Sequence, residues 1–205
     1  FTAKLRVIKK DSDTKQTVLV PNAEFKIFNI DKNEYVKQYT TYPSKVEHTS
    51  FFTDDDGDLI LPEALKIGNY RIEEVSAPYG YVVNDKYVSI SVDTDTAFET
   101  DGDTNDAIIT VEYSDAPAVG ELTVEKKGEV LDGFKGGLFA NSEDKEFVYK
   151  EGSLAGAVFK VYAAEDIFTA DNQKDADGNR IKYYSKGDLV ATLTTGKDGK
   201  AVAKN

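Results

Sequence analysis

The sequence predicts an all-β protein built from two tandem β-sandwiches. Three observations support this fold class. Short segments alternate apolar and polar residues, turn residues separate these segments, and the second half of the chain repeats motifs of the first. Seven or so short strands at this spacing are typical of a sandwich.

The first strand is expected over residues 3–10, where Ala3, Leu5, Val7 and Lys9 share one face because side chains alternate along a strand. A single helical turn is expected over residues 62–65, which begin with a proline. Further strand signals lie at 23–27, 35–36, 59–61, 70–74, 87–92 and 108–113.

The second half of the chain copies the first. Residues 5–10 recur as 122–127, residues 22–28 as 156–162, and the turn 53–58 as 195–200. This alignment matches Asn205 with Glu63, so the second copy stops before it reaches counterparts of residues 70–74 and 108–115. We therefore expect a complete domain over 1–117, a truncated one over 118–205 with exposed strand edges, and a natural protein that continues.

Composition excludes several functions. The 205 residues include no Cys, no Met and one His, His48, and the net charge is −12. Thiol chemistry and multi-histidine sites therefore cannot be assembled, and no basic stripe is available for nucleic acid. No apolar run approaches the length of a membrane span. We expect a processed or excised piece of a longer protein that has no cofactor, is not an enzyme, and makes no membrane contact through this segment.

Glu74 is the most informative residue. Alternation places it on the same strand face as Tyr70 and Ile72, which should point into a core. A lone buried carboxylate costs several kcal/mol unless it is paired or protonated. Glu74 therefore either lies at a strand end that has reached water or has a chemical role.

Three segments resemble a known family. They are the first strand ending at Lys9, the segment 70–74 followed by Ala77-Pro78-Tyr79-Gly80-Tyr81, and Tyr113-Ser114-Asp115 followed by Pro117. They resemble the opening strand, the E-box and the closing strand of CnaB-type (SpaA-like, prealbumin-like) domains of Gram-positive pilins and surface adhesins. The resemblance covers residues 1–117 and the front part of 118–205, and it implies an Ig-like or prealbumin-like sandwich.

The resemblance implies a self-formed isopeptide bond between the Lys9 amine and the Asp115 carboxyl, promoted by Glu74. Desolvation favours the neutral forms of both amines and carboxyls, which suits this reaction. If the register differs by one residue, Lys4 or Lys10 would replace Lys9. Asp115 could instead be a turn residue before Pro117, with Asp106 as a weaker substitute. Lys126 holds the lysine position of the second copy and is expected to be unbonded here.

The resemblance also implies a function. It indicates a structural stalk or pilus-backbone module that lies outside the cell, anchored to the cell wall through regions beyond this fragment. Its partners would be neighbouring domains of the same surface protein or pilus. The alternative is an adhesin module that recognises a host protein or glycan. The cross-link would form once per molecule, without turnover.

One acidic loop is a weak calcium candidate. It contains Asp171, Asp175, Asp177 and Asn179, whose oxygens could suit Ca²⁺. The loop lacks the closing Glu of the twelve-residue calcium loop, and these residue types also build solvated turns. We favour the turn.

Overall fold

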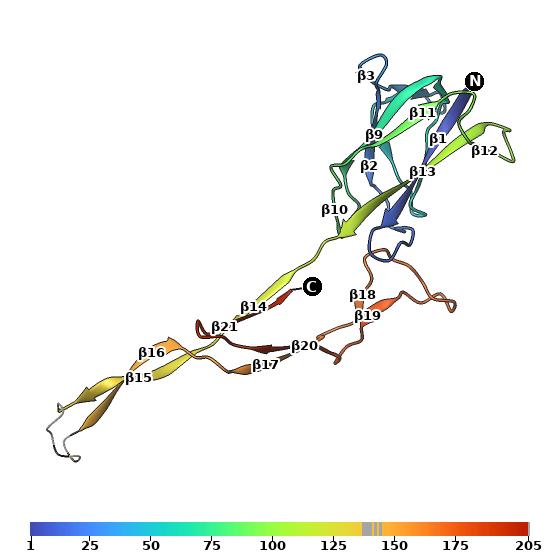
Figure 1. The fold of residues 1–205 in the computed structure, drawn as a ribbon. Coiled ribbons are helices and arrows are strands. Elements are labelled where there is room, and N and C mark those ends of the chain that lie inside the picture. The colour runs from blue at the N-terminus through green and yellow to red at the C-terminus, as the bar shows by residue number, and fades with distance from the viewer. Residues whose placement is uncertain (137–140, 142, 144, 205) are drawn as a thin grey trace. The chain divides into compact units, whose positions relative to one another are not determined.

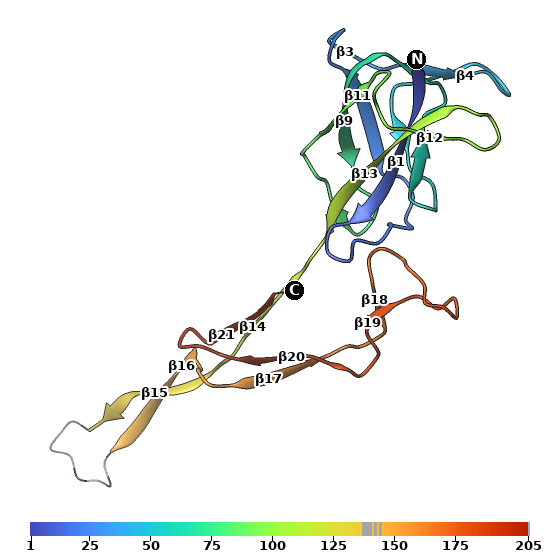
Figure 2. The same ribbon diagram turned by 45° about the vertical axis from the view of Figure 1, so that its right-hand side comes forward.

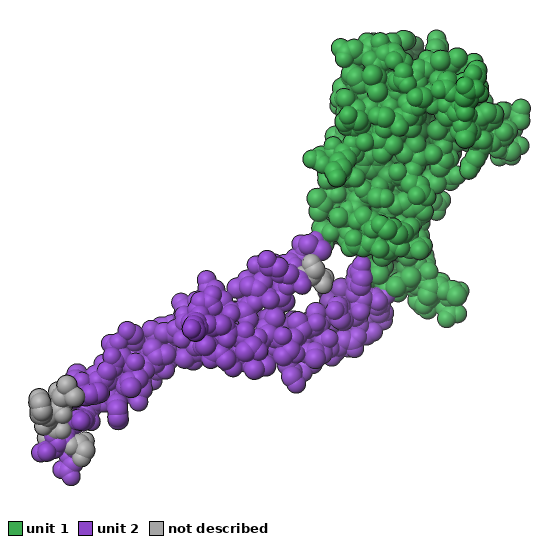
Figure 3. All heavy atoms as spheres, in the orientation of Figure 1, with its two compact units in different colours: residues 1–118, 168–181 green, residues 119–167, 182–205 purple. Residues whose placement is uncertain are grey.

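The computed structural model describes residues 1–136, 141, 143 and 145–204, and its secondary structure in this part of the chain consists of β-strands without an α-helix. The chain divides into two compact units (Figure 3). Unit 1 comprises residues 1–118 and 168–181, and unit 2 comprises residues 119–167 and 182–205. The segment 168–181 thus belongs to unit 1, although it comes from the second half of the sequence. Asn205 lies outside the described residues.

The first sheet of unit 1 is organised around β1 (Thr2–Asp11). This strand lies between β13 (Ala107–Pro117), to which it runs parallel, and β7 (Asp58–Ile60), to which it runs antiparallel. Figures 1 and 2 both show β1 beside β13. Short strands extend the sheet: β8 (Leu65–Lys66) pairs with β1, while β10 (Tyr81–Val82) and β12 (Glu99–Thr100) pair with β13.

The second sheet is organised around β9 (Gly68–Ser76). It pairs with β11 (Val88–Val92) on one side and β2 (Glu24–Asn29) on the other, both antiparallel. Two short strands, β3 (Glu34–Tyr35) and β6 (Phe51–Phe52), pair with β2. A separate hairpin is formed by β4 (Gln38–Thr40) and β5 (Val46–His48).

The core lies between these two sheets. Alternate residues of β1 are buried along its length, as the sequence pattern predicts, and they join residues of β2, β9 and β13 in one apolar cluster. Phe25 of β2 meets Tyr113 of β13 edge-on, with ring centroids 5.0 Å apart. The prediction of an all-β sandwich is therefore confirmed.

The predicted helical turn at 62–65 is wrong. Leu65 begins β8, where it is paired with Ala3 and buried in the core. Burial of this leucine against β1 outweighs the preference of Pro62 for the start of a helix.

Unit 2 contains two-stranded sheets. Strand β14 (Glu121–Glu125) pairs with β21 (Lys200–Lys204), and β17 (Val158–Tyr162) pairs with β20 (Leu189–Thr194). Strand β15 (Lys127–Lys135) pairs with β16 (Glu146–Ser153) across a bulge. The short strand β18 (Ile167–Phe168), at the boundary between the two units, pairs with β19 (Lys182–Tyr184). Within the described residues β14 has one strand partner, whereas β1 has β7, β8 and β13.

Backbone hydrogen bonds reproduce the sequence repeat. The amide of Lys9 donates to the Gly57 carbonyl at 2.8 Å, and the amide of Lys126 donates to the Gly199 carbonyl at 2.7 Å. The Val18 amide likewise donates to the Lys9 carbonyl, as the Leu154 amide does to that of Lys126. The backbone amides of Thr53 and Thr195 donate to the carbonyls of Ala23 and Ala157. The β15–β16 hairpin therefore occupies the place of the short 10–17 loop of the first copy.

Candidate functional site

Three strands bring Lys9, Glu74 and Asp115 together. Lys9 lies near the end of β1 and Asp115 near the end of β13. Because the parallel register pairs Lys9 with Tyr113, Asp115 lies two residues further along and on the same face. Glu74 comes from β9 in the facing sheet, where the pattern Tyr70, Ile72, Glu74 points inward.

The three side chains are in direct contact and have no exposed surface. Lys9 Nζ lies 2.5 Å from Asp115 Oδ1 and 2.9 Å from Glu74 Oε1. The alternative lysines are partly exposed and have other partners. Lys4 pairs with Asp106 at 2.9 Å, and Lys10 lies 3.7 Å from Glu112.

These groups have few other polar neighbours. Among the described residues, Lys9 Nζ, Glu74 Oε1 and both Asp115 carboxyl oxygens make no contact with hydrogen-bond geometry, although the ion-pair distances are short. The ammonium nitrogen also faces two rings, at 4.8 Å from the Tyr113 centroid and 5.8 Å from that of Phe25. The amine and both carboxyl groups therefore face mainly each other in a site without water access.

Burial dominates the electrostatics of the site. It raises the pKa of Glu74 from 4.5 to about 7, while the Asn84 amide and Lys9 act to lower this pKa and Asp115 acts to raise it further. The Asn84 amide donates to Glu74 Oε2 at 2.9 Å. Glu74 can therefore carry a proton near neutral pH, which is the condition for proton transfer to or from a neighbour.

Sequence reasoning missed several residues around this site. Asn84 follows β10 in an irregular segment, so no periodicity marks it. Asp11 is fully buried two residues after Lys9, and its Oδ2 accepts a 2.7 Å hydrogen bond from the Tyr81 hydroxyl. The alternation of β1 extends to Asp11 and could have indicated its burial.

A comparison with protein-family models places residues 3–107 in the family described as SpaA, prealbumin-like fold domain. The chain belongs to this family. No curated protein sequence matches it. The family assignment covers β1 and β9, which carry Lys9 and Glu74, and ends before Asp115.

Comparison with solved structures finds several that are similar to this SpaA prealbumin-like protein. The Bacillus anthracis TIE protein matches with 22% identity and a TM-score of 0.51, over 100% of this chain and 26% of that one. A group B streptococcus pilus 2b backbone protein matches with 21% identity and a TM-score of 0.43, over 56% of this chain and 41% of its own. The major pilin subunit of Bacillus cereus matches with 14% identity and a TM-score of 0.44, over 100% of this chain and 53% of that one. The chain thus spans between a quarter and about half of these proteins.

The remaining candidates lie elsewhere in this SpaA prealbumin-like protein. Lys126 is exposed. Asp171 is buried, and its carboxylate accepts hydrogen bonds from Thr169, Thr14 and the Gln173 amide. Its backbone carbonyl accepts a 2.8 Å hydrogen bond from the Leu19 amide.

The other residues of this acidic loop form a turn. Asp175 Oδ1 accepts the amides of Asp177 and Asn179. No cluster of three or more His, Cys, Asp or Glu side chains suited to a metal ion occurs within the described residues. The same residues include no helix long and apolar enough to cross a membrane.

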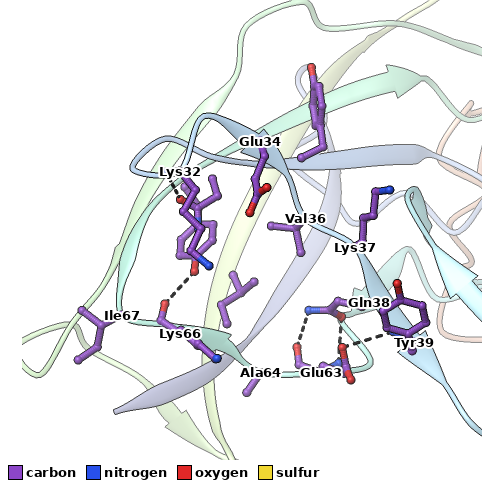
Figure 4. Close-up of a pocket in the computed structure, with 14 residues that line it drawn as sticks. Lys32, Glu34, Val36, Lys37, Gln38, Tyr39, Glu63, Ala64, Lys66 and Ile67 are labelled. Atoms are coloured by element: carbon purple, nitrogen blue, oxygen red, sulfur yellow. Dashed lines mark hydrogen bonds between the residues drawn. The ribbon is translucent and has the colours of Figure 1, made fainter.

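A surface groove of about 630 Å³ lies where β2 ends and β9 begins (Figure 4). Its floor is fixed by the buried amide of Gln38, which donates to the Glu63 carbonyl at 2.8 Å and accepts from the Glu63 amide at 2.9 Å. Three lysines and three tyrosines line it: Lys32, Lys37, Lys66, Tyr35, Tyr39 and Tyr70.

Proposed function

We propose that this chain is a structural module of a Gram-positive surface protein, of the pilus-backbone or stalk type, whose first domain forms an isopeptide bond between Lys9 and Asp115. The observation that carries this proposal is the buried contact of Lys9 with both Asp115 and Glu74, in which the reacting groups have almost no other polar partners. An amine, a carboxyl group and a protonatable promoter are all that amide formation requires.

The reaction balances without a cofactor. A new bond joins Lys9 Nζ to the Asp115 carboxyl carbon, and one carbon–oxygen bond of that carboxyl breaks. The Lys9 ammonium gives up two protons, and the departing oxygen takes both and leaves as water. Glu74 passes a proton from the nitrogen to this oxygen and ends in the protonation state in which it began. Folding holds the amine and the carboxyl group at a high effective concentration.

The bond suits a protein that is pulled outside the cell. It would link the neighbouring strands β1 and β13 covalently without cysteine oxidation, in a chain that has no Cys. Attachment to a cell wall, and contacts with neighbouring domains or pilus subunits, would be made through other parts of the parent protein.

Intact-mass spectrometry of the purified chain and of its Glu74→Ala variant tests this proposal. We expect the parent to be lighter than its sequence mass by one water and the variant to have its full mass. Tandem mass spectrometry should then find the Lys9 and Asp115 peptides joined. A parent chain with its full sequence mass would overturn the proposal.

The groove favours an adhesin as the second candidate function. It combines exposed parts of Tyr35 and Tyr39 with three lysines, which outnumber the lining carboxylates of Glu34 and Glu63 and suit a glycan that carries an acidic group. Titration with sialylated and neutral oligosaccharides would test this candidate. The candidate is supported if sialylated oligosaccharides bind to the parent and not to Tyr35→Ala. It is rejected if neither the sialylated nor the neutral oligosaccharides bind to the parent.

A further inference from the structure

Asn84 connects Glu74 to the strand that carries Asp115. Its backbone amide donates to Glu74 Oε2 at 2.9 Å, and its side-chain Nδ2 donates to the carbonyl of Ser114 at 2.8 Å. Its own carbonyl lies 2.9 Å from the Tyr113 hydroxyl, which also contacts the Lys86 carbonyl. One residue of an irregular segment is thus tied to β9 once and to β13 twice.

These contacts distinguish the two oxygens of Glu74. Oε2 faces an N–H donor, whereas Oε1 faces Lys9 Nζ at 2.9 Å. The oxygen of a carboxylic acid that carries the proton is a poor acceptor, and the other oxygen accepts well. When Lys9 is the neutral, nucleophilic amine, its nitrogen can accept a hydrogen bond, and a donor fixed at Oε2 leaves Oε1 as the oxygen that carries the proton, on the side of this amine.

We propose that Asn84 is a positioning residue for isopeptide formation: its amide holds Glu74 with the proton on Oε1, and its side chain keeps this arrangement in register with Asp115. This inference rests on the proposed cross-link between Lys9 and Asp115. Asn84 does not touch the reacting atoms and acts through Glu74 and through the backbone next to Asp115.

Two effects should follow when the side chain of Asn84 is shortened. Without the bond to the Ser114 carbonyl, segment 83–87 is less firmly held, so the amide contacts Glu74 less well and either carboxyl oxygen can carry the proton. The same amide lowers the pKa of Glu74, so weakening it raises that pKa further. The cross-link should form more slowly, and the loss of rate as Glu74 deprotonates should move to higher pH.

The experiment follows water loss over time. The full chain, recovered unfolded in urea, is diluted into folding buffers between pH 5 and pH 9, quenched at intervals and weighed by mass spectrometry. Asn84→Ala and the similarly sized Asn84→Asp remove the donor to Ser114. Asp85→Ala is the matched control, because Asp85 is the exposed next residue.

We expect Asp85→Ala to follow the parent and both Asn84 variants to lose water about tenfold more slowly, the effect of losing one hydrogen bond near a charged group. The pH at which the rate of water loss falls should be higher in the Asn84 variants than in the parent, which a general loss of stability would not produce. If the Asn84 variants fold and lose water at the parent's rate, with the parent's dependence on pH, the inference about Asn84 is overturned while the cross-link stands. Asn84→Asp decides the matter if Asn84→Ala does not fold. A parent that never loses water would instead reject the cross-link itself, and with it the role of Asn84.

Discussion

Replacing Glu74 with Gln should prevent the cross-link while it keeps the size of the side chain. A bond between residues 9 and 115 would close a loop of about 107 residues, counted from the sequence. The chain-entropy relation assigns roughly 4.7 kcal/mol to a cross-link that closes about 100 residues. The free energy of unfolding of unit 1 should therefore fall by about this amount in Glu74→Gln.

This loss is large enough to measure by calorimetry. Unit 1 contains about 130 residues, and an unfolding entropy of about 2.1 cal/mol/K per residue gives about 0.27 kcal/mol/K. The melting temperature of unit 1 should consequently drop by about 15–20 °C. Glu112→Gln is the control, because Glu112 is an exposed residue of β13 whose 3.7 Å pairing with Lys10 contributes little, about 2 °C or less.

The refuting result is specific. If mass spectrometry shows the parent cross-linked and Glu74→Gln not, yet both melt within about 3 °C of each other, the entropic reasoning fails. A drop in Glu112→Gln as large as that in Glu74→Gln would show that the effect does not come from the site.

Three further predictions follow from the same contacts. In Asp115→Ala, which cannot cross-link, burial still holds the folded-state pKa of Glu74 above its unfolded value of 4.5, although loss of the Asp115 charge brings this pKa below the value of about 7 in the parent. This contribution to the free energy of unfolding should therefore be fully present below pH 4.5 and be lost as the pH rises through the folded-state pKa of Glu74, a fall in urea unfolding curves that adding Glu74→Gln should abolish. Asp171→Ala should speed amide hydrogen exchange around Thr14, whose hydroxyl donates to the Asp171 carboxylate, more than at Leu19, whose amide donates to the backbone carbonyl that alanine keeps; unchanged exchange around Thr14 would contradict this role. Lys126→Ala should lose one water as the parent does, because Lys126 is exposed; a parent that loses two waters would refute this expectation.

The sandwich could be predicted because its signals are local. A strand with one buried face alternates with a period of two, and in β1 this period extends from Ala3 to Asp11. The same alternation directed attention to Lys9 and Glu74, and the structure buries both. The cross-link between Lys9 and Asp115 stays a prediction until its mass is measured.

Contacts made by irregular segments could not be predicted. Asn84 lies in a stretch without periodicity, and its role depends on two strands that are distant in sequence. The docking of Asp171 joins residues 152 to 157 positions apart, for which no local pattern exists. At Leu65 a local preference pointed to a helix, and tertiary burial against β1 prevailed.

The positions of Lys9 and Asp115 explain why a bond between them would matter mechanically. They lie near the ends of the first and last long strands of unit 1, so the bond leaves outside its loop only residues 1–8 and 116–118 of the segment 1–118. Without the bond, that segment could extend to about 400 Å at roughly 3.4 Å per residue. With the bond, only residues 1–9 and 115–118 carry the extension, which is then about 45 Å. Tension would then pass through the amide bond, and residues 10–114 would remain folded while the molecule bears load. A lysine earlier in β1 would shorten the free segment by only a few residues, so the position of Lys9 already encloses most of the domain.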